Sequence, residues 1–206
     1  MARLFVPGFG ARASFYRDAL GSGWLLHDPP PFRSASRFET HVDALQRRLE
    51  AFDEPLTLAG HSLGAAAAVA ATARAPERVE RLLLVAPAGL PLAKPMAESL
   101  RDFGGQVRDG VYPRAELRRA LLALAAAPWS AYRLARAVRA LDLRAELEQV
   151  RAAGVACDVV ACTGDTLAPG DHCRRIADLA GARFREIAAH GGHMWMVVDP
   201  AAFGTL

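Results

Sequence analysis

Short apolar runs alternate with longer amphipathic segments along most of the chain. Residues 38–52, for example, place Val42, Leu45 and Leu49 on one side of a helix. Runs with the length and apolar content of buried strands fall at 4–6, 24–27, 56–59, 79–86, 155–161 and 184–188. Alternation of this kind is typical of a parallel sheet covered by helices on both faces. We therefore predict an α/β fold, a three-layer α/β/α sandwich whose sheet has about six mostly parallel strands.

The segment from 89 to 154 breaks this alternation, because it contains helical patterns and no strand pattern. Pro113 and Pro128 suit the first turns of two of these helices. Apolar residues recur there at helical spacing, as in Leu117, Leu121 and Leu124, in Leu134, Val138 and Leu141, and in Leu143, Leu147 and Val150. We predict that 89–154 is a helical insertion over one edge of the sheet, and that 1–88 and 155–206 together form the core.

Composition is that of a globular protein and excludes several function classes. Of the 206 residues, 52% are apolar and 23% are charged, and the net charge of +3 is spread without long runs of one sign. Nothing in this distribution indicates a nucleic-acid partner. The apolar stretches at 1–6 and 65–71 are too short for a secretory signal or for a membrane span of ~20 residues.

The cysteines give no sign of a metal site or a disulfide framework. Cys157, Cys162 and Cys173 are odd in number and match no zinc-binding spacing. Reduced thiols are typical of a reducing compartment. We therefore expect a cytoplasmic protein without a bound metal.

The pattern with the most chemical content is Gly60-His61-Ser62-Leu63-Gly64, which follows a strand pattern and precedes an alanine-rich helix. In that context a serine sits on a strained strand-to-helix turn with its hydroxyl projecting from the sheet. Glycine is needed two residues to either side because strand and helix come close together there. The positive end of the helix and the Leu63 N–H then face a developing oxyanion. The pattern indicates that Ser62 is a nucleophile.

A serine nucleophile needs a base, and the base needs a group that orients it. Asp165 follows the strand pattern at 155–161, in a loop that contains Gly164 and Pro169, and His193 follows the strand pattern at 184–188. Parallel sheets place their sites at the carboxyl ends of strands, and the chain order Ser, Asp, His suits such a site. We predict that His193 is the general base and acid and that Asp165 orients it.

Other histidines and aspartates compete for these roles. The glycine immediately before His193 favours it over His190, which we interpret as the end of a strand, and we interpret His61 as packing beside the serine. Asp158 lies near the start of its strand, at the wrong end of the sheet. Asp171 has the position of a helix N-cap.

Together these features resemble the α/β-hydrolase family across nearly the whole chain. The run 60–64 resembles its nucleophile elbow, Gly164-Asp165-Thr166-Leu167-Ala168-Pro169 its acid loop, and Gly192-His193 with Pro200 its histidine loop. Pro7-Gly8-Phe9-Gly10 resembles its oxyanion loop, with proline at position 7 where many members have histidine. The resemblance implies that the Phe9 and Leu63 N–H groups form the oxyanion hole and that 89–154 is a lid. It also implies that the first two strands of the family's sheet are absent.

Three apolar side chains are candidates for a substrate pocket. Phe9 lies in the loop that resembles the oxyanion loop, and Met194 follows His193 directly. Trp129 either walls the pocket or holds the helices of the insertion together. For the neighbouring Trp195 and Met196 we favour ordinary core packing.

These observations predict a serine hydrolase that acts on a small-molecule carboxylic ester or thioester through an acyl-enzyme, with no metal or organic cofactor. One alternative keeps the same residues and breaks a carbon–carbon bond, by hydrolysis or elimination. Another is a ligand-binding protein of the same fold with little turnover. The sequence leaves the acyl group, the leaving group and the oligomeric state open.

Overall fold

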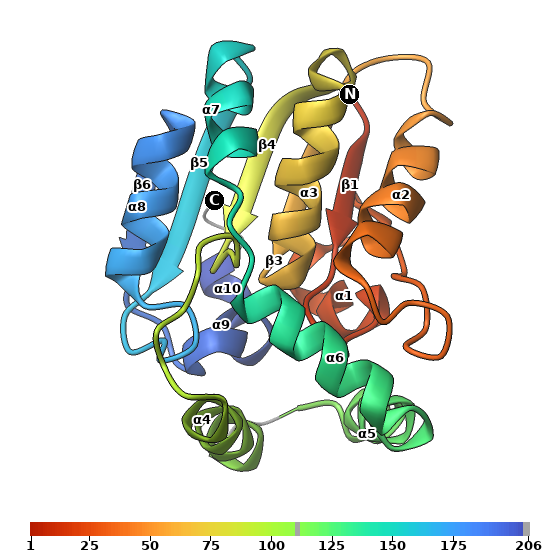
Figure 1. The fold of residues 1–206 in the computed structure, drawn as a ribbon, viewed down its shortest axis with the longest axis vertical. Helices are drawn as coiled ribbons and strands as arrows, with labels where there is room; N and C mark the ends of the chain where they lie inside the picture. Colours follow the sequence, from red (N-terminus) through yellow and green to blue (C-terminus); the bar gives the residue numbers. More distant parts are fainter. Residues whose placement is uncertain (110–111, 204–206) are drawn as a thin grey trace.

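The computed structural model describes residues 1–109 and 112–203, and its centre is a parallel six-stranded sheet (Figure 1). The strands lie in the order β2-β1-β3-β4-β5-β6. Their bounds are β1 (Arg3–Val6), β2 (Leu25–Leu26), β3 (Leu56–His61), β4 (Val79–Val85), β5 (Ala156–Cys162) and β6 (Arg183–Ile187). The predicted α/β class and strand number are confirmed, although the second strand is shorter than its apolar run and β3 continues into His61.

Successive strand residues point to opposite faces of the sheet, and here both faces are apolar. Helices therefore cover both faces. Leu82 and Leu84 of β4 are buried in one apolar cluster, whereas Leu83 and Val85 belong to the other. The first face carries α2 (Phe38–Leu49), α3 (Leu63–Arg74), α7 (Arg144–Ala152) and α8 (Gly170–Ala180). The second carries the 3₁₀ turn η1 (Ala13–Tyr16), α1 (Arg17–Leu20), α9 (Trp195–Val198) and α10 (Pro200–Phe203).

Three helices stand apart from these layers, below the carboxyl ends of the strands (Figure 1). They are α4 (Met96–Asp109), α5 (Arg114–Ala126) and α6 (Pro128–Arg139). The predicted insertion 89–154 also includes α7, which packs against α3 and α8 in the layer on the sheet. Leu147 and Val150 of α7 are buried in the main core cluster, which accounts for its place there.

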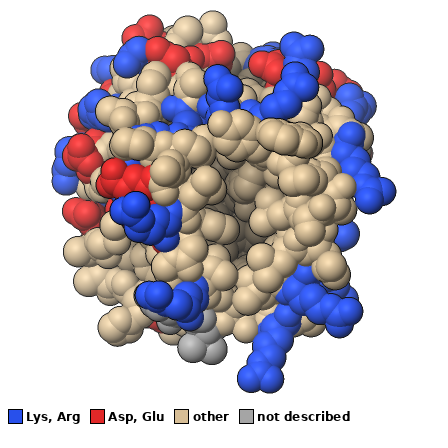
Figure 2. All heavy atoms as spheres, turned by 60° about the horizontal axis from the view of Figure 1, so that its bottom comes forward, with Lys and Arg blue, Asp and Glu red and all other residues tan. Residues whose placement is uncertain are grey.

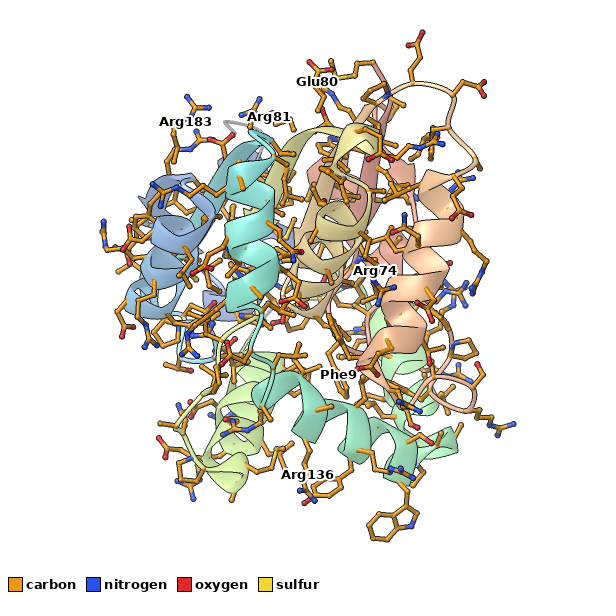
Figure 3. All side chains as sticks on the ribbon, turned by 45° about the horizontal axis from the view of Figure 1, so that its top comes forward. Phe9, Arg74, Glu80, Arg81, Arg136 and Arg183 are labelled. Carbon is orange, nitrogen blue, oxygen red and sulfur yellow. The ribbon has the colours of Figure 1, made fainter. Side chains whose placement is uncertain are left out.

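The amino-terminal edge of the sheet is held by an ion-pair cluster far from the loops with chemical content. The Asp158 side chain is only 2% exposed, and it accepts hydrogen bonds from Arg81 at 2.7 and 3.0 Å and from Arg183 at 2.9 Å. In Figure 3 both arginines lie at the opposite end of the sheet from Phe9. Asp158 therefore joins β4, β5 and β6. Its place near a strand start, away from these loops, agrees with the sequence analysis.

Candidate active site

Ser62 occupies the turn between β3 and α3 with a strained backbone. Its φ of 53° and ψ of −115° lie in a region that non-glycine residues avoid, at a typical cost of about 1–3 kcal/mol. The surrounding backbone holds this conformation: Ser62 N–H donates to the Val85 carbonyl at 3.0 Å, and the Ser62 carbonyl accepts from Ala66 and Ala88 N–H. The turn thus has the conformation that the Gly-x-Ser-x-Gly pattern predicted.

Glycine is required at positions 60 and 64 because a side chain at either position would clash with the backbone. A Cβ atom on Gly64 would lie 2.3 Å from the Val6 carbonyl oxygen, and one on Gly60 would lie 2.5 Å from the Gly64 carbonyl oxygen. Both contacts are with backbone that cannot move aside cheaply. Close approach of β3, α3 and the end of β1 explains why glycine occurs at both positions.

His193 and Asp165 are brought together by the loops that follow β6 and β5. His193 Nδ1 lies 2.8 Å from Asp165 Oδ2, and both side chains are buried. The other carboxylate oxygen, Oδ1, accepts the N–H groups of Leu167 and Ala168 at 2.8 and 3.0 Å. Burial raises the pKa of Asp165, but the charge of His193 and these hydrogen bonds outweigh it and hold the pKa below its ordinary value. An ionised Asp165 fixes the proton on His193 Nδ1 and leaves Nε2 as the basic nitrogen.

His61 connects the nucleophile turn to the loop of His193. Its ring centroid lies 4.7 Å from that of His193, and its Nε2 lies 2.9 Å from the His193 carbonyl oxygen. A carbonyl can only accept, so Nε2 carries the proton and Nδ1 accepts from the Tyr16 hydroxyl at 2.9 Å. The Tyr16 oxygen in turn accepts the Gly8 N–H at 3.3 Å. Burial lowers the pKa of His61 to about 3, so the ring stays neutral. Each donor in this chain of hydrogen bonds therefore points from Gly8 toward the His193 carbonyl.

The loop after β1 lies against the serine. A Cβ on Gly8 would lie 2.7 Å from His61 Nδ1 and 3.3 Å from the Ser62 Cβ, so glycine lets this loop approach both residues closely. Leu63 is the first residue of α3, where helix N–H groups lack partners within the helix. Within 1–109 and 112–203, no hydrogen bond uses the N–H of Phe9 or of Leu63. Both groups suggested for an oxyanion hole are therefore uncommitted in the described structure.

A small apolar hollow of about 50 Å³ lies between this loop, the His193 loop and the α4–α5 helices. Figure 2, which brings the α4–α6 end forward, shows that face hollowed, with mostly uncharged side chains around the opening and basic side chains further out. The hollow is lined by Phe9, Gly10, Ala11, Phe15, Phe103, Val107, Tyr112, Leu117, Ala120, Leu124 and Met194. The predicted pocket residues Phe9 and Met194 are among them.

The structure does not bring Trp129 to this hollow. It is 78% exposed and makes an edge contact with Tyr132, which is on the same helix. The reason is the orientation of α6, which turns Ala131 and Leu134 toward the core and leaves Trp129 outside. Trp129 is therefore not among the residues that line this hollow.

The competing residues lie where they cannot replace the predicted ones. His190 is exposed in the turn before Gly191, beyond the end of β6. Asp171 lies in the first turn of α8 and is not its N-cap, because that position is occupied by Pro169. Asp158 is committed to its two arginines.

Sequence reasoning missed Tyr16, Thr166 and Gln106. The carboxamide of Gln106, on α4, accepts the His193 N–H at 2.9 Å and donates to the Thr166 hydroxyl oxygen at 3.2 Å. Neither Tyr16 nor Gln106 stands in a motif. Their partners are also distant in sequence, so a local pattern could not have revealed them.

Three further properties concern metal ligands, the cysteines and membrane spans. Among the described residues no cluster of histidine, cysteine, aspartate and glutamate has the geometry of a metal site. The three cysteines are buried and free, and burial raises the pKa of the Cys157 thiol to about 12. In the same ranges, no helix is long and apolar enough to cross a membrane.

This combination of a strained serine turn, a paired histidine and aspartate, and a glycine loop packed against the serine has a counterpart in a known family. A family model for the alpha/beta hydrolase family matches residues 4–205. The chain belongs to the alpha/beta hydrolase family. No curated protein matches the chain.

Solved structures of alpha/beta hydrolases and related enzymes share the fold at low identity. A putative lipase from Acinetobacter baumannii AYE has a TM-score of 0.76 at 16% identity, covering 98% of this chain and 80% of that one. A lipase-esterase related protein from Clostridium acetobutylicum has a TM-score of 0.74 at 12% identity, covering 99% and 91%. The thioesterase domain from the curacin biosynthetic pathway has a TM-score of 0.64 at 17% identity, covering 99% and 89%. At these identities the likeness concerns the fold alone.

Proposed function

We propose that this alpha/beta hydrolase is a serine hydrolase that cleaves a small carboxylic ester or thioester through an acyl-enzyme. The observation that carries the proposal is the 2.8 Å contact between His193 Nδ1 and Asp165 Oδ2, in a loop that His61 joins to the strained turn of Ser62. An imidazole oriented by a carboxylate, with a serine hydroxyl within its reach, is the arrangement that activates serine as a nucleophile.

In the proposed reaction, Ser62 Oγ attacks the carbonyl carbon while His193 Nε2 takes its proton. The tetrahedral intermediate carries its negative charge on the former carbonyl oxygen, which the Phe9 and Leu63 N–H groups bind. His193 then returns the proton to the leaving alkoxide or thiolate, which departs as alcohol or thiol. Water then attacks the acyl-enzyme carbonyl while His193 takes a proton from it. His193 passes that proton to Ser62 Oγ as the carboxylic acid leaves, which restores Ser62. Asp165 remains ionised throughout and stabilises the imidazolium.

The acyl side of the substrate would occupy the apolar hollow. Its lining has no charged side chain, and it opens beside both Phe9 and Met194. A volume of about 50 Å³ favours a short acyl chain, because ligand pockets for larger molecules typically exceed about 300 Å³. Helices α4–α6 would act as the lid in this proposal, since α4 and α5 supply the outer wall. The names of the similar lipases, esterase-related protein and thioesterase fit this substrate class.

The test combines a covalent probe with a point variant. The parent protein is expected to react with a fluorophosphonate at Ser62 and to hydrolyse activated esters of short acids. Ser62→Ala should abolish labelling and lower turnover by at least about 10⁴-fold. Hydrolysis by Ser62→Ala at the parent rate would overturn the proposal. Absence of labelling in a folded parent would favour a ligand-binding role.

A further inference from the structure

Gln106 connects the two loops that carry the candidate acid and base. Its Oε1 accepts the backbone N–H of His193 at 2.9 Å, and its Nε2 donates to Oγ1 of Thr166, the residue after Asp165, at 3.2 Å. The two segments also meet through the contact between Asp165 and the His193 ring and, nearer the strands, through the Thr163 N–H, which donates to the Ile187 carbonyl at 2.9 Å. A single carboxamide on α4 thus makes a further connection between them, from outside the sheet.

The position of Gln106 is itself fixed from several directions. The Tyr112 hydroxyl donates to the Gln106 carbonyl at 3.1 Å. Gly192 has φ +53°, and a Cβ there would lie 3.2 Å from Gln106 Cδ, so a side chain on Gly192 would press on the carboxamide. Lys94, just before α4, donates to the Thr166 carbonyl at 3.3 Å. The start and the later turns of α4 are therefore both attached to the loops of the site.

The face of α4 that carries Gln106 also forms the wall of the apolar hollow. Phe103 and Val107 line the hollow, and they lie three residues before and one residue after Gln106. Residues at positions i, i+3 and i+4 share one side of a helix. A group that presses on Phe103 and Val107 therefore presses on the element that holds His193 in place.

We propose that Gln106 is a positioning residue. It holds the His193 and Asp165 loops at a fixed position relative to each other, and this position depends on how the acyl group packs against α4. It does not touch the reacting atoms and acts through His193 N–H and Thr166 Oγ1. The inference rests on the proposed serine hydrolase mechanism and adds a residue on α4 to it. It accounts for a carboxamide that uses both its oxygen and its nitrogen in hydrogen bonds beside the apolar residues Phe103 and Val107.

The experiment uses near-isosteric variants of the full chain. Gln106→Met keeps the length and packing of the side chain but removes both hydrogen bonds, and Thr166→Val removes the hydroxyl oxygen alone. Gln106→Met is expected to lower kcat by about ten- to a hundredfold, because small misplacement of catalytic groups is that costly, with KM changed less than about twofold. The thermal midpoint should stay close to that of the parent. Arg101→Met, on the exposed side of the same helix, is the matched control and should leave kcat unchanged.

Two readouts separate positioning from a general loss of structure. Gln106→Met should broaden the low-field proton resonance of the hydrogen bond between His193 Nδ1 and Asp165, while Arg101→Met leaves it sharp. The effects of Gln106→Met and Thr166→Val on kcat should be less than additive, because both remove the same bond. Gln106→Met should also flatten the dependence of kcat/KM on acyl length.

The outcomes distinguish this inference from the proposed function. If the folded parent is not labelled at Ser62, the mechanism fails, and the proton resonance alone then decides whether Gln106 orders the two loops. If the parent is labelled and Gln106→Met is labelled at the same rate with the same kcat, the mechanism stands and the positioning role is overturned. A fall in kcat that follows only a fall in thermal midpoint overturns it as well.

Discussion

The sheet core and the α4–α6 helices of this molecule are built in different ways. In the core, strand residues such as Leu58, Leu84 and Val159 are fully buried, and covering helices pack on both faces. In α4–α6 several large apolar side chains stay in solvent: Leu100, Leu121, Leu122, Trp129 and Tyr132 are 44–78% exposed. Those helices are attached partly through polar contacts, including Lys94 and Gln106 to Thr166 and Ser14 to Glu116.

This difference indicates which regions of the molecule tolerate substitutions. Ser62, Asp165 and His193 belong to turns and loops at the carboxyl ends of core strands, so tight packing fixes their backbone. The wall of the hollow comes from helices that share few buried residues with that core. In the proposed function, chemistry therefore depends on the core, and substrate choice depends on α4–α6.

Alanine substitutions at Gly64 in the core and Gly104 in α4 are expected to give the largest difference in unfolding free energy between the two regions. Gly64→Ala places a Cβ 2.3 Å from the Val6 carbonyl oxygen, so we expect destabilisation of more than about 3 kcal/mol or failure to fold. Gly104→Ala, in α4, meets no atom within 4 Å and should stabilise the helix by about 0.5–1 kcal/mol. Chemical denaturation of both variants measures this. Equal stability of the two variants would contradict the proposed difference between the regions.

Tyr16→Phe is expected to have an intermediate effect. It leaves both His61 Nδ1 and the Gly8 N–H without a partner in a buried site, which costs about 1–3 kcal/mol. Turnover should fall as well, because the loops of Gly8 and His193 lose their connection through His61. Tyr132→Phe, on the exposed side of α6, should change unfolding free energy by less than about 0.5 kcal/mol. Unchanged stability in Tyr16→Phe would show that the chain of hydrogen bonds is unimportant.

Much of the fold and the clustering of three candidate site residues at the carboxyl ends of the strands were predictable from local pattern. Alternation of apolar runs predicts the sheet, and Ser62, Asp165 and His193 each follow a strand within a glycine-containing turn or loop. Gln106 was not predictable, because its partners are 60 and 87 residues away and no periodicity records such a contact. The packing of α7 on the sheet layer was not predictable either, because an amphipathic pattern does not reveal which surface a helix covers.

Trp129→Ala is expected to have the smallest effect. The side chain lies outside the hollow and is 78% exposed, so unfolding free energy should change by less than about 0.5 kcal/mol. The preference among acyl lengths should stay the same. Phe103→Ala, which enlarges the hollow, should shift that preference toward longer chains. A larger shift in acyl preference for Trp129→Ala than for Phe103→Ala would mean that substrates bind on the outer face of α6.

The central claim is that Ser62 carries the acyl group during turnover. Rapid mixing with an activated short-chain ester, followed by acid quench and mass spectrometry of the digested protein, measures this directly. The account predicts a burst of about one leaving group per active molecule and an acyl adduct on the peptide that contains Ser62. Turnover without any adduct, or an adduct on another residue that forms as fast as the burst, would contradict it.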